Sequence, residues 1–453
     1  MDVCAIILAA GKGSRMKSKY HKGTHKVCGK EIINILIDKL KKCGVDDINL
    51  VVGEYRESLI DVTKDKSVTY SFQEQQLGTG HAVLSAYDFL KNKKGNVLIF
   101  ACDIPLFKEE SINELLSVHF KEENSLTFVT SVLDDALSYG RIIRKDGKVF
   151  CIREAKDCTK EELSINEINT SLYCFKIEDL LDGIKNIKNC NAQNEFYLTD
   201  IIEIFNGENK KIGTICADKN EVVGVDSRKQ LSYANELLRK EINENHMNNG
   251  VTFLNPESTY IDMDVKIEKD VIIHPNVCIY GSTVIEEDCE IFSNTKIVNS
   301  FIGKNTKIDS SVIYDSKVGE NTNIGPFAYL RPNSIIEDAV KIGDFVEIKN
   351  STIGSGTKIS HLSYVGDAVV GKKCNLGCGI VTVNYDGKDK NKTIIEDECF
   401  VGCNVNLVAP VTVERNSYVA AGTTITEKVD SNSLAIGRCK QTNIENWVIK
   451  KFK

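Results

Sequence analysis

An aliphatic residue recurs at every sixth position over much of the second half of the chain. Isoleucine stands at all seven such positions from 261 to 297, and the rhythm returns from Val318 to Ile348 and from Ile395 to Ile425 after fading near Ile302 and Ile308. A period of six matches neither a helix nor the alternation of an ordinary strand. It is typical of a hexapeptide β-helix, in which each hexad supplies one short strand and one corner. Three hexads close a triangular coil of about 18 residues, and coils stack about 4.8 Å apart.

A polar helix is predicted immediately before this repeat. Between Arg228 and Met247, apolar residues follow the spacing of one helix face while the opposite face is charged. We therefore expect a first domain over residues 1–227, a linker helix over residues 228–250, and a β-helix domain with a C-terminal tail over residues 251–453.

The first domain alternates strands with helices. Apolar runs predict strands at residues 2–10, 48–52 and 97–101, and periodic segments predict helices near residues 32–40, 56–63 and 196–205. This alternation is typical of an α/β fold with a mostly parallel sheet, whose ligands bind at the carboxyl ends of the strands. Three further strands are expected in an added layer, at residues 127–132, 141–144 and 149–152.

The bulk properties narrow the class of protein. A net charge of −7 argues against a general nucleic-acid binder. No apolar run is long enough to cross a bilayer, and the N-terminus lacks the basic flank of a signal peptide, so we expect a cytoplasmic protein without a membrane partner. Its 16 cysteines should then be mostly reduced thiols. Two CxxxC pairs, Cys374/Cys378 and Cys399/Cys403, are predicted to pack in corners or core rather than to bind a metal.

A glycine-rich loop follows the first strand. Residues 8–16 read Leu-Ala-Ala-Gly-Lys-Gly-Ser-Arg-Met, and the glycines allow backbone N–H groups to approach a phosphate while Lys12 and Arg15 add positive charge. The loop is not a dinucleotide fingerprint, because Met16 stands at the final glycine position, and it lacks the GK[ST] of a Walker loop. The complete string resembles the signature of sugar-phosphate nucleotidyltransferases.

Further motifs narrow this resemblance. They are Gln-Glu-Gln-Gln-Leu-Gly-Thr-Gly-His-Ala at 73–82, Ser-Tyr-Gly-Arg-Ile at 138–142, Glu154, Glu-Ile-Asn-Thr at 167–170 and Tyr-Leu-Thr-Asp at 197–200. With the β-helix behind them, essentially the whole chain resembles the GlmU family, the bifunctional uridylyltransferase–acetyltransferases of UDP-N-acetylglucosamine synthesis. The resemblance implies a Rossmann-like nucleotidyltransferase domain followed by a left-handed parallel β-helix.

The resemblance implies that the first domain transfers UMP from UTP to N-acetylglucosamine-1-phosphate and releases pyrophosphate. Arg15 and Lys22 would serve the triphosphate, and Asp103 and Asp226 would hold Mg²⁺, a hard cation suited to carboxylates. The positions implied for the uridine nucleotide and the N-acetyl sugar are Leu8, Gly11, Gln73, Gly78, Thr79, Gly140, Glu154 and Asn169.

Three residues depart from the family pattern around this site. The usual proline before Lys22 is absent from the run Tyr20-His21-Lys22-Gly23-Thr24-His25, so we expect a more flexible loop. Asp226 stands where asparagine is common, and its extra negative charge should tighten Mg²⁺ binding. Ala101 replaces a family tyrosine, which removes one nucleotide contact.

A second site is expected where the hexads are interrupted. The resemblance assigns His361 to the base of acetyl transfer, and imidazole suits the task because it is neutral near pH 7 and can accept a proton from an amine. The positions implied for glucosamine-1-phosphate are Arg331, Lys349, Tyr364, Asn375 and Lys390. The positions implied for acetyl-CoA are Cys378, Asn384, Tyr385, Cys403, Ala421 and Arg438.

The β-helix also predicts assembly. Its flat faces are usually covered by association, and the resemblance implies a homotrimer whose acetyltransferase sites form between neighbouring β-helices. The repeat stops past Ile425, and we expect Trp447, the single tryptophan, to cap the last coil or to pack on a neighbouring subunit.

Two other functions fit parts of the chain. One is a sugar-1-phosphate nucleotidyltransferase whose β-helix is only an assembly or regulatory scaffold, and the other is a uridylyltransferase for another sugar. Scaffold proteins lack the combination of His361, Asn375 and the Asn384-Tyr385 pair, so its presence favours the bifunctional enzyme.

Overall fold

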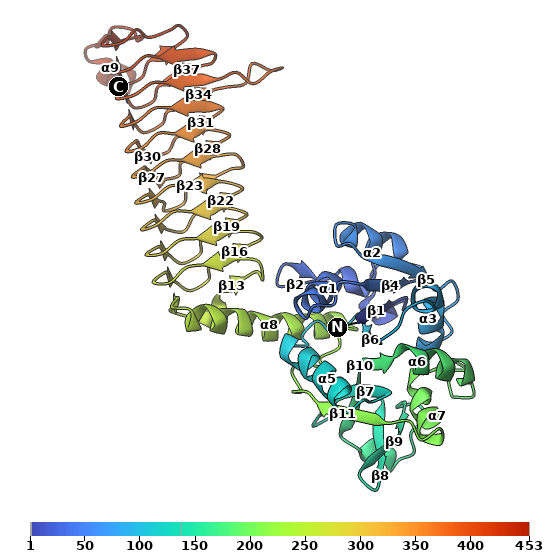
Figure 1. Cartoon of the computed structure of the whole chain (residues 1–453). Helices are drawn as coiled ribbons and strands as arrows, with labels where there is room; N and C mark the ends of the chain where they lie inside the picture. The colour runs from blue at the N-terminus through green and yellow to red at the C-terminus, as the bar shows by residue number, and fades with distance from the viewer. Residues whose placement is uncertain (1, 137, 453) are drawn as a thin grey trace. The chain divides into compact units, whose positions relative to one another are not determined.

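The computed structural model describes residues 2–136 and 138–452, and the chain forms two compact units, Met1–Leu238 and Arg239–Lys453 (Figure 1). The predicted linker helix is present as α8, Arg228–Asn248, and the division between the units falls within it. Helix α8 is the longest helix of the described residues and is polar, and none of the described helices qualifies as a membrane-spanning segment.

A twisted, mainly parallel sheet forms the centre of the first unit. Its strands follow the order β11-β7-β10-β6-β1-β4-β5, and only β10 runs antiparallel to both of its neighbours. In this order the strands are Ile212–Cys216, Leu126–Val132, Glu167–Lys176, Asn96–Ala101, Val3–Ala9, Ile48–Val52 and Thr69–Phe72.

The expectation that residues 127–132 belong to an added layer was wrong. They form β7 inside the main sheet, between β10 and β11, and six of its seven residues are buried, as is usual for a strand covered on both faces. Only the hairpin of β8, Arg141–Lys145, and β9, Lys148–Arg153, lies off this path, where β8 pairs with β10.

Helices cover both faces of the sheet. The core on one face combines side chains of β1 with α1 (Ile32–Lys42) and α5 (Glu109–Lys121). The core on the other face includes α3, α6 and α7, which span Thr79–Ser85, Ile177–Gly183 and Ile201–Gly207. Two further helices are α2, Arg56–Thr63, and α4, Tyr87–Leu90. The helix predicted near residues 196–205 begins as a 3-10 turn at Leu198–Asp200 before α7 starts.

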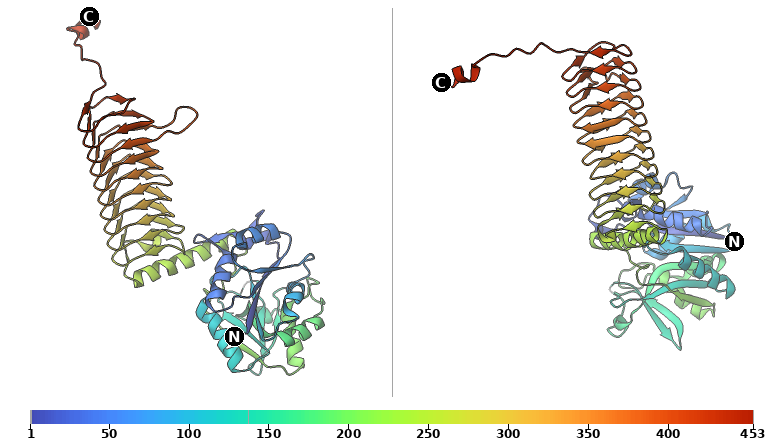
Figure 2. Two further views of the ribbon diagram at one scale, coloured as in Figure 1. Left: turned by 45° about the horizontal axis from the view of Figure 1, so that its top comes forward. Right: turned by 90° about the vertical axis from the view of Figure 1, so that its left-hand side faces the viewer.

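The second unit is a left-handed parallel β-helix. It has three sheets of 11, 10 and 9 strands, and each strand pairs with the strand one coil later, so that the sheets form the faces of a prism (Figures 1 and 2). We name them sheet C (β12 to β41), sheet D (β13 to β40) and sheet E (β14 to β38). The first strand is β12, Thr252–Phe253, and the last is β41, Leu434–Ala435.

The inward-pointing aliphatic residues form one continuous core. Ile302, Ile308, Ile313 and Val318 are all fully buried, although the sequence rhythm fades there. Three of the four steps between inward residues from Ile297 to Val318 shorten from six to five, so the coil continues while the sequence period slips. The repeat also extends past Ile425, because β41 pairs with β39, Tyr418–Val419.

The ends of the β-helix differ. In the part of α8 that belongs to the second unit, Ile242 packs on the core and the side-chain amide of Asn243 donates to the carbonyl oxygens of Pro256 and Thr259, at 2.8 and 3.2 Å. This segment therefore covers the first coil. At the other end, Trp447 lies in α9, Trp447–Lys451, and is 47% exposed, so it does not fill the end of the coil within one chain.

The cysteines occupy two kinds of position. Cys374 and Cys399 are buried in the core of the β-helix, as predicted. Cys378 is half-buried and Cys403 is exposed, and both lie at corners. All 16 cysteines are free thiols.

Candidate active sites

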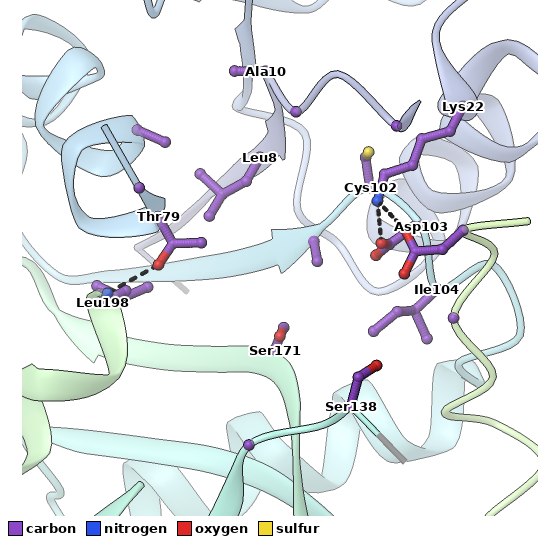
Figure 3. A pocket seen from close by; sticks show the side chains of 18 of the residues that line it. Leu8, Ala10, Lys22, Thr79, Cys102, Asp103, Ile104, Ser138, Ser171 and Leu198 are labelled. Carbon is purple, nitrogen blue, oxygen red and sulfur yellow. Dashed lines mark hydrogen bonds and ion pairs between the residues drawn. The ribbon is translucent and has the colours of Figure 1, made fainter. Parts of the chain in front are cut away.

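A cavity of about 700 Å³ opens at the carboxyl ends of β1 and β6 in the first unit. Figure 3 shows side chains from several separate segments around it. Its lining includes every residue that the sequence analysis assigned to the uridylyl-transfer site, namely Leu8, Gly11, Arg15, Lys22, Gln73, Gly78, Thr79, Asp103, Gly140, Glu154, Asn169 and Asp226. The structure therefore brings all of these predicted residues together.

Two carboxylates converge on one cation at one end of this cavity. Lys22 Nζ donates to Asp103 Oδ2 (Figure 3). It also donates to Asp226 Oδ1, at 2.8 Å. Arg15 Nη2 donates to Asp226 Oδ2 at 2.7 Å. Burial lowers the pKa of Lys22, but the two carboxylates outweigh burial and raise that pKa overall. For Asp226, burial raises the pKa, and Lys22 with Arg15 outweighs it and lowers the pKa overall.

The same carboxylates fit a divalent cation. Their oxygens already lie within hydrogen-bonding distance of a single atom, Lys22 Nζ, so both can reach one point. Hard oxygen ligands suit Mg²⁺, which commonly takes one or two carboxylates and completes its shell with water and substrate phosphates. The donor set formed by Asp103 and Asp226 therefore fits Mg²⁺.

The loop that carries Lys22 is more constrained than its sequence suggests. His21 is 1% exposed, and its Nδ1 accepts a hydrogen bond from the backbone N–H of Gly23 at 3.0 Å. That bond caps the short helix Lys22–Thr24. Burial, with the neighbouring Lys22 ammonium, lowers the pKa of His21 to about 4, so the imidazole is neutral near pH 7. A buried cap thus takes over the restraint that a proline would provide.

The part of the cavity predicted to bind the sugar contains supporting contacts that the sequence analysis missed. Thr199 Oγ1 donates to Glu154 Oε1 at 3.2 Å, and Asn169 Nδ2 donates to the hydroxyl of Tyr173 at 2.7 Å. Burial raises the pKa of Glu154. A Cβ at Gly140 would lie 3.4 Å from both carboxylate oxygens of Glu154. Thr199 belongs to a motif noted in the sequence, but Tyr173 carries no sequence signal of its own.

The part predicted to bind the nucleotide depends on close backbone packing. Gln73 Nε2 donates to the carbonyl oxygen of Gly78 at 3.1 Å, and Thr79 Oγ1 accepts from the N–H of Leu198 at 2.9 Å (Figure 3). Gly78 has φ +109°, and a Cβ there would lie 2.6 Å from the carbonyl oxygen of Phe196, so only glycine fits. The small side chain of Ala101 also lines the cavity.

In the second unit, one set of predicted residues stacks along the corner between sheets C and D. His361 ends β30 (Lys358–His361), and its Nδ1 lies 2.6 Å from Oδ1 of Asp344 on the coil before. Later turns of the same corner carry four of the positions predicted for acetyl-CoA, Cys378, Cys403, Ala421 and Arg438. Backbone bonds join these turns, and Arg438 Nη1 donates to the carbonyl oxygen of Ala421 at 2.8 Å.

A second set gathers at the opposite edge of sheet D, where it meets sheet E. Asp367 is the centre of this group, because it accepts hydrogen bonds from Asn350, at 2.6 Å, and Asn384, and pairs with Lys349 at 3.5 Å. Asn384 also donates to the hydroxyl of Tyr364, at 3.4 Å. Two more predicted residues, Tyr385 and Lys390, lie in the loop that protrudes from the β-helix (Figure 1). They form an isolated antiparallel β-bridge with each other.

Two predicted residues remain. Arg331 belongs near the group around Asp367, since the Lys349 ammonium, and with it Arg331, lowers the pKa of Lys390. Arg331 ends its turn of sheet D one coil before Lys349 and pairs with Glu347 at 2.9 Å. Asn375 begins β33, Asn375–Leu376, on sheet C. Within the described chain, no hydrogen bond or ion pair joins the group around His361 to the group around Asp367. Sheet D therefore lies between the group around His361 and the group around Asp367 in a single chain. The predicted sets are not divided in the same way, because Asn384 and Tyr385, predicted for acetyl-CoA, lie with residues predicted for glucosamine-1-phosphate.

Asp344 and Asp367 were not among the residues predicted from the sequence. Asp344 precedes His361 by 17 residues, which is one coil, and Asp367 precedes Asn384 by the same distance. A search for polar residues one coil apart could have found both pairs. Such a search would have required the number of residues at each corner, because the coil here is one residue shorter than three full hexads.

Comparisons with known proteins agree with this architecture. Residues 5–139 match the MobA-like NTP transferase domain family, and residues 312–434 match the GMPPB C-terminal domain family. Three curated relatives carry the name bifunctional protein GlmU and span nearly their whole length and that of this chain. They come from Clostridium botulinum (strain 657 / Type Ba4), 55% identical over 99% of this chain and 98% of the relative; Clostridium novyi (strain NT), 53% over 99% and 98%; and Clostridium beijerinckii (strain ATCC 51743 / NCIMB 8052), 52% over 100% and 99%.

The chain belongs to the GlmU family of bifunctional proteins. It is accordingly a transferase with two activities, a uridylyltransferase acting on N-acetylglucosamine-1-phosphate and an acetyltransferase acting on glucosamine-1-phosphate. A β-helix that serves only as a scaffold, or a uridylyltransferase for another sugar, does not account for this membership.

Proposed function

We propose that the cavity of the first unit carries out uridylyl transfer from UTP, with Asp103 and Asp226 holding Mg²⁺. The observation that carries the proposal is the lining of one cavity by all twelve predicted residues. A phosphate oxygen of N-acetylglucosamine-1-phosphate attacks the α-phosphorus of UTP, the new P–O bond forms, and pyrophosphate leaves. When bound, Mg²⁺ supplies charge neutralisation at the phosphates.

The chain's own residues have three roles in this proposal. Lys22 and Arg15 place positive charge beside the triphosphate, where phosphoryl transfer depends on positioning and on charge neutralisation. Gln73, Gly78 and Thr79 bind the uracil. Glu154 and Asn169 hold the N-acetyl sugar and are themselves held by Thr199 and Tyr173.

Uridylyl transfer should depend on the protonation of His21. Its folded pKa, about 4, lies below the ordinary histidine value of roughly 6.5, so neutral His21 stabilises the Lys22 loop above pH 6.5 and that stabilisation is lost as pH falls toward 4. His21→Asn keeps a side-chain acceptor for the cap but does not titrate. We expect the parent to lose pyrophosphate release a few-fold more steeply than His21→Asn as pH falls from about 5 to 4, where the folded imidazole takes up its proton. Superimposable pH–rate profiles would contradict this role.

We propose that acetyl transfer takes place between neighbouring chains of a homotrimer. The support is the position of sheet D between the group around His361 and the group around Asp367 in one chain. Acetyl-CoA would lie along the corner that carries His361, Cys378, Cys403 and Ala421, with Arg438 at its end. Glucosamine-1-phosphate would be held at the opposite edge of the neighbouring chain by Arg331, Lys349, Tyr364 and Lys390, with Asn384 and Tyr385 closing the site. Asn375, on sheet C, would reach the sugar from the His361 side.

A complementation experiment tests the shared site. His361→Ala and Lys349→Met each remove one half, and each variant alone should be nearly inactive in acetyl transfer. If each site takes its halves from two chains, mixed trimers regain one intact site in three, so random mixing of equal amounts should restore about a quarter of the parent rate of CoA release.

Light scattering should give a mass of three chains for each variant and for the mixture, and differently tagged chains should co-purify. Failure of verified mixed trimers to regain activity would contradict a site built from two chains. An active monomer would contradict assembly as a requirement. The control is the parent chain mixed with a variant that carries both His361→Ala and Lys349→Met. Its rate of CoA release reports how many intact sites remain after random mixing of active and inactive chains.

We also propose a cytoplasmic location. The support is the chemistry of the chain, whose 16 free thiols suit a reducing compartment where both UTP and acetyl-CoA are available.

A further inference from the structure

The strongest unassigned feature of the second unit is the carboxylate beside His361. Asp344 Oδ1 lies 2.6 Å from His361 Nδ1, a distance at which an N–H donates to a carboxylate. The hydrogen bond from His361 is the first cause that lowers the pKa of Asp344, so the carboxylate is ionised near pH 7. His361 Nε2 has no hydrogen-bond partner within the described chain, and the His361 side chain is 59% exposed. Nδ1 of His361 is therefore hydrogen-bonded to Asp344, whereas Nε2 is available to a substrate.

The position of this pair follows from two unusually long strands of sheet C. Nine of the eleven strands of sheet C are two residues long, whereas β27 (Lys341–Asp344) and β30 (Lys358–His361) have four. The longer ladder brings Asp344 into register with His361, and side chains paired in register point to the same face of a sheet.

Close approach of the two strands requires glycine at 343. A Cβ at Gly343 would lie 1.9 Å from the carbonyl oxygen of Ser360, so any other residue would push β27 away from β30. The dyad of Asp344 and His361 is therefore built into the two coils where sheet C is extended, next to the positions predicted for acetyl-CoA.

We propose that Asp344 is a positioning residue for acetyl transfer, whose carboxylate holds the Nδ1 proton of His361 so that Nε2 faces the reacting amine as the base. The inference rests on the proposed role of His361 and adds the residue that orients it. Which ring nitrogen carries the proton is set by the hydrogen bond that the other nitrogen makes, and here the bond to Asp344 selects the tautomer.

The proposed step balances as a proton transfer coupled to acyl transfer. The sugar amine attacks the thioester carbonyl carbon, the C–N bond forms, and the C–S bond breaks as CoA leaves. The proton lost by nitrogen passes to His361 Nε2 and then to the departing sulfur or to water. While it holds both protons, the imidazolium is stabilised by the negative charge of Asp344 at 2.6 Å. Asp344 itself stays ionised throughout.

The test separates positioning from structural support. Asp344→Ala should lower kcat for acetyl transfer by about 10- to 100-fold, a part of the 10²–10⁴-fold that a general base contributes, and should leave KM for both substrates within about twofold. Asp344→Asn keeps an acceptor for Nδ1 without the charge, so its kcat should lie between the alanine variant and the parent. In a His361→Ala background, Asp344→Ala should have no further effect, because Asp344 acts only through the imidazole.

A matched control comes from the early coils. His274 Nε2 pairs with Glu290 Oε1 at 3.2 Å on the same sheet, far from the predicted site, so Glu290→Ala should leave acetyl transfer unchanged. All variants should be compared at equal assembly mass and thermal midpoint, and Asp344→Asn, nearly identical in shape to the parent, remains informative if the alanine variant folds poorly.

Two outcomes would overturn the inference. If Asp344→Ala and Asp344→Asn keep the parent kcat while His361→Ala is inactive, the base stands but Asp344 does not position it. If Asp344→Ala lowers activity further in the His361→Ala background, its role is structural. A fully active His361→Ala variant would instead contradict the proposed base itself.

Discussion

Replacing Asp103 with alanine is expected to reduce Mg²⁺-dependent pyrophosphate release by about 10³-fold or more and to leave acetyl transfer at the parent rate. The variant removes one of the two carboxylates that converge on a single cation in the first cavity. A metal ion typically supplies several kcal/mol of charge stabilisation, and each 1.36 kcal/mol is tenfold in rate. The residues proposed for acetyl transfer lie in the other compact unit, so this activity should persist.

The matched control for this variant is Asp134→Ala. Asp134 also pairs with a lysine, Lys219, at 2.9 Å, but its side chain is 92% exposed on the surface of the same unit. It should release pyrophosphate at the parent rate. Raising the Mg²⁺ concentration should restore more pyrophosphate release to Asp103→Asn than to Asp103→Ala, since an amide oxygen can still act as a metal ligand. Pyrophosphate release at the parent rate by Asp103→Ala would refute the assignment.

Replacing His361 with alanine should lower acetyl transfer by about 10²–10⁴-fold, which is the typical contribution of a general base. A free sugar amine is mostly protonated near pH 7, and attack on the thioester leaves a positively charged nitrogen that must lose a proton. A neutral imidazole within hydrogen-bond reach removes it. The affinity for acetyl-CoA should change little, because the other positions of that corner remain, and uridylyl transfer should be untouched.

His274→Ala is the natural control for the second variant, because it removes an imidazole from the regular coils of the same unit. The affinity for acetyl-CoA can be measured by calorimetry and acetyl transfer by the appearance of free CoA. If His361→Ala acetylated glucosamine-1-phosphate at the parent rate, the proton would have to pass to another group or to water.

Much of the fold could be predicted because its cause is local. The six-residue rhythm follows directly from the shape of the coil, and strands such as β4, Ile48–Val52, and helices such as α2, Arg56–Thr63, have the predicted bounds. The place of β7 in the main sheet could not be read in the same way. It depends on β10, a ten-residue strand that pairs with β7 on one side and with β6 and β8 on the other.

The second site shows a different limit. His361 stands in a recognisable motif, whereas Asp344 lies one coil away, and that distance is 17 residues rather than 18 because the inward residues step by five from Ile348 to Ile353. The loop around Lys22 is a similar case, since the cap by His21 depends on burial that the local sequence does not reveal.

The most direct test of the account is a pair of assays on the same preparations. Pyrophosphate release and free CoA release should be measured separately for the parent, Asp103→Ala and His361→Ala. The account predicts a crossed pattern, in which Asp103→Ala loses only pyrophosphate release and His361→Ala loses only CoA release. If either variant lost both activities together while keeping the parent's assembly mass and thermal midpoint, or if neither lost its own, the assignment of two separate active sites would be contradicted.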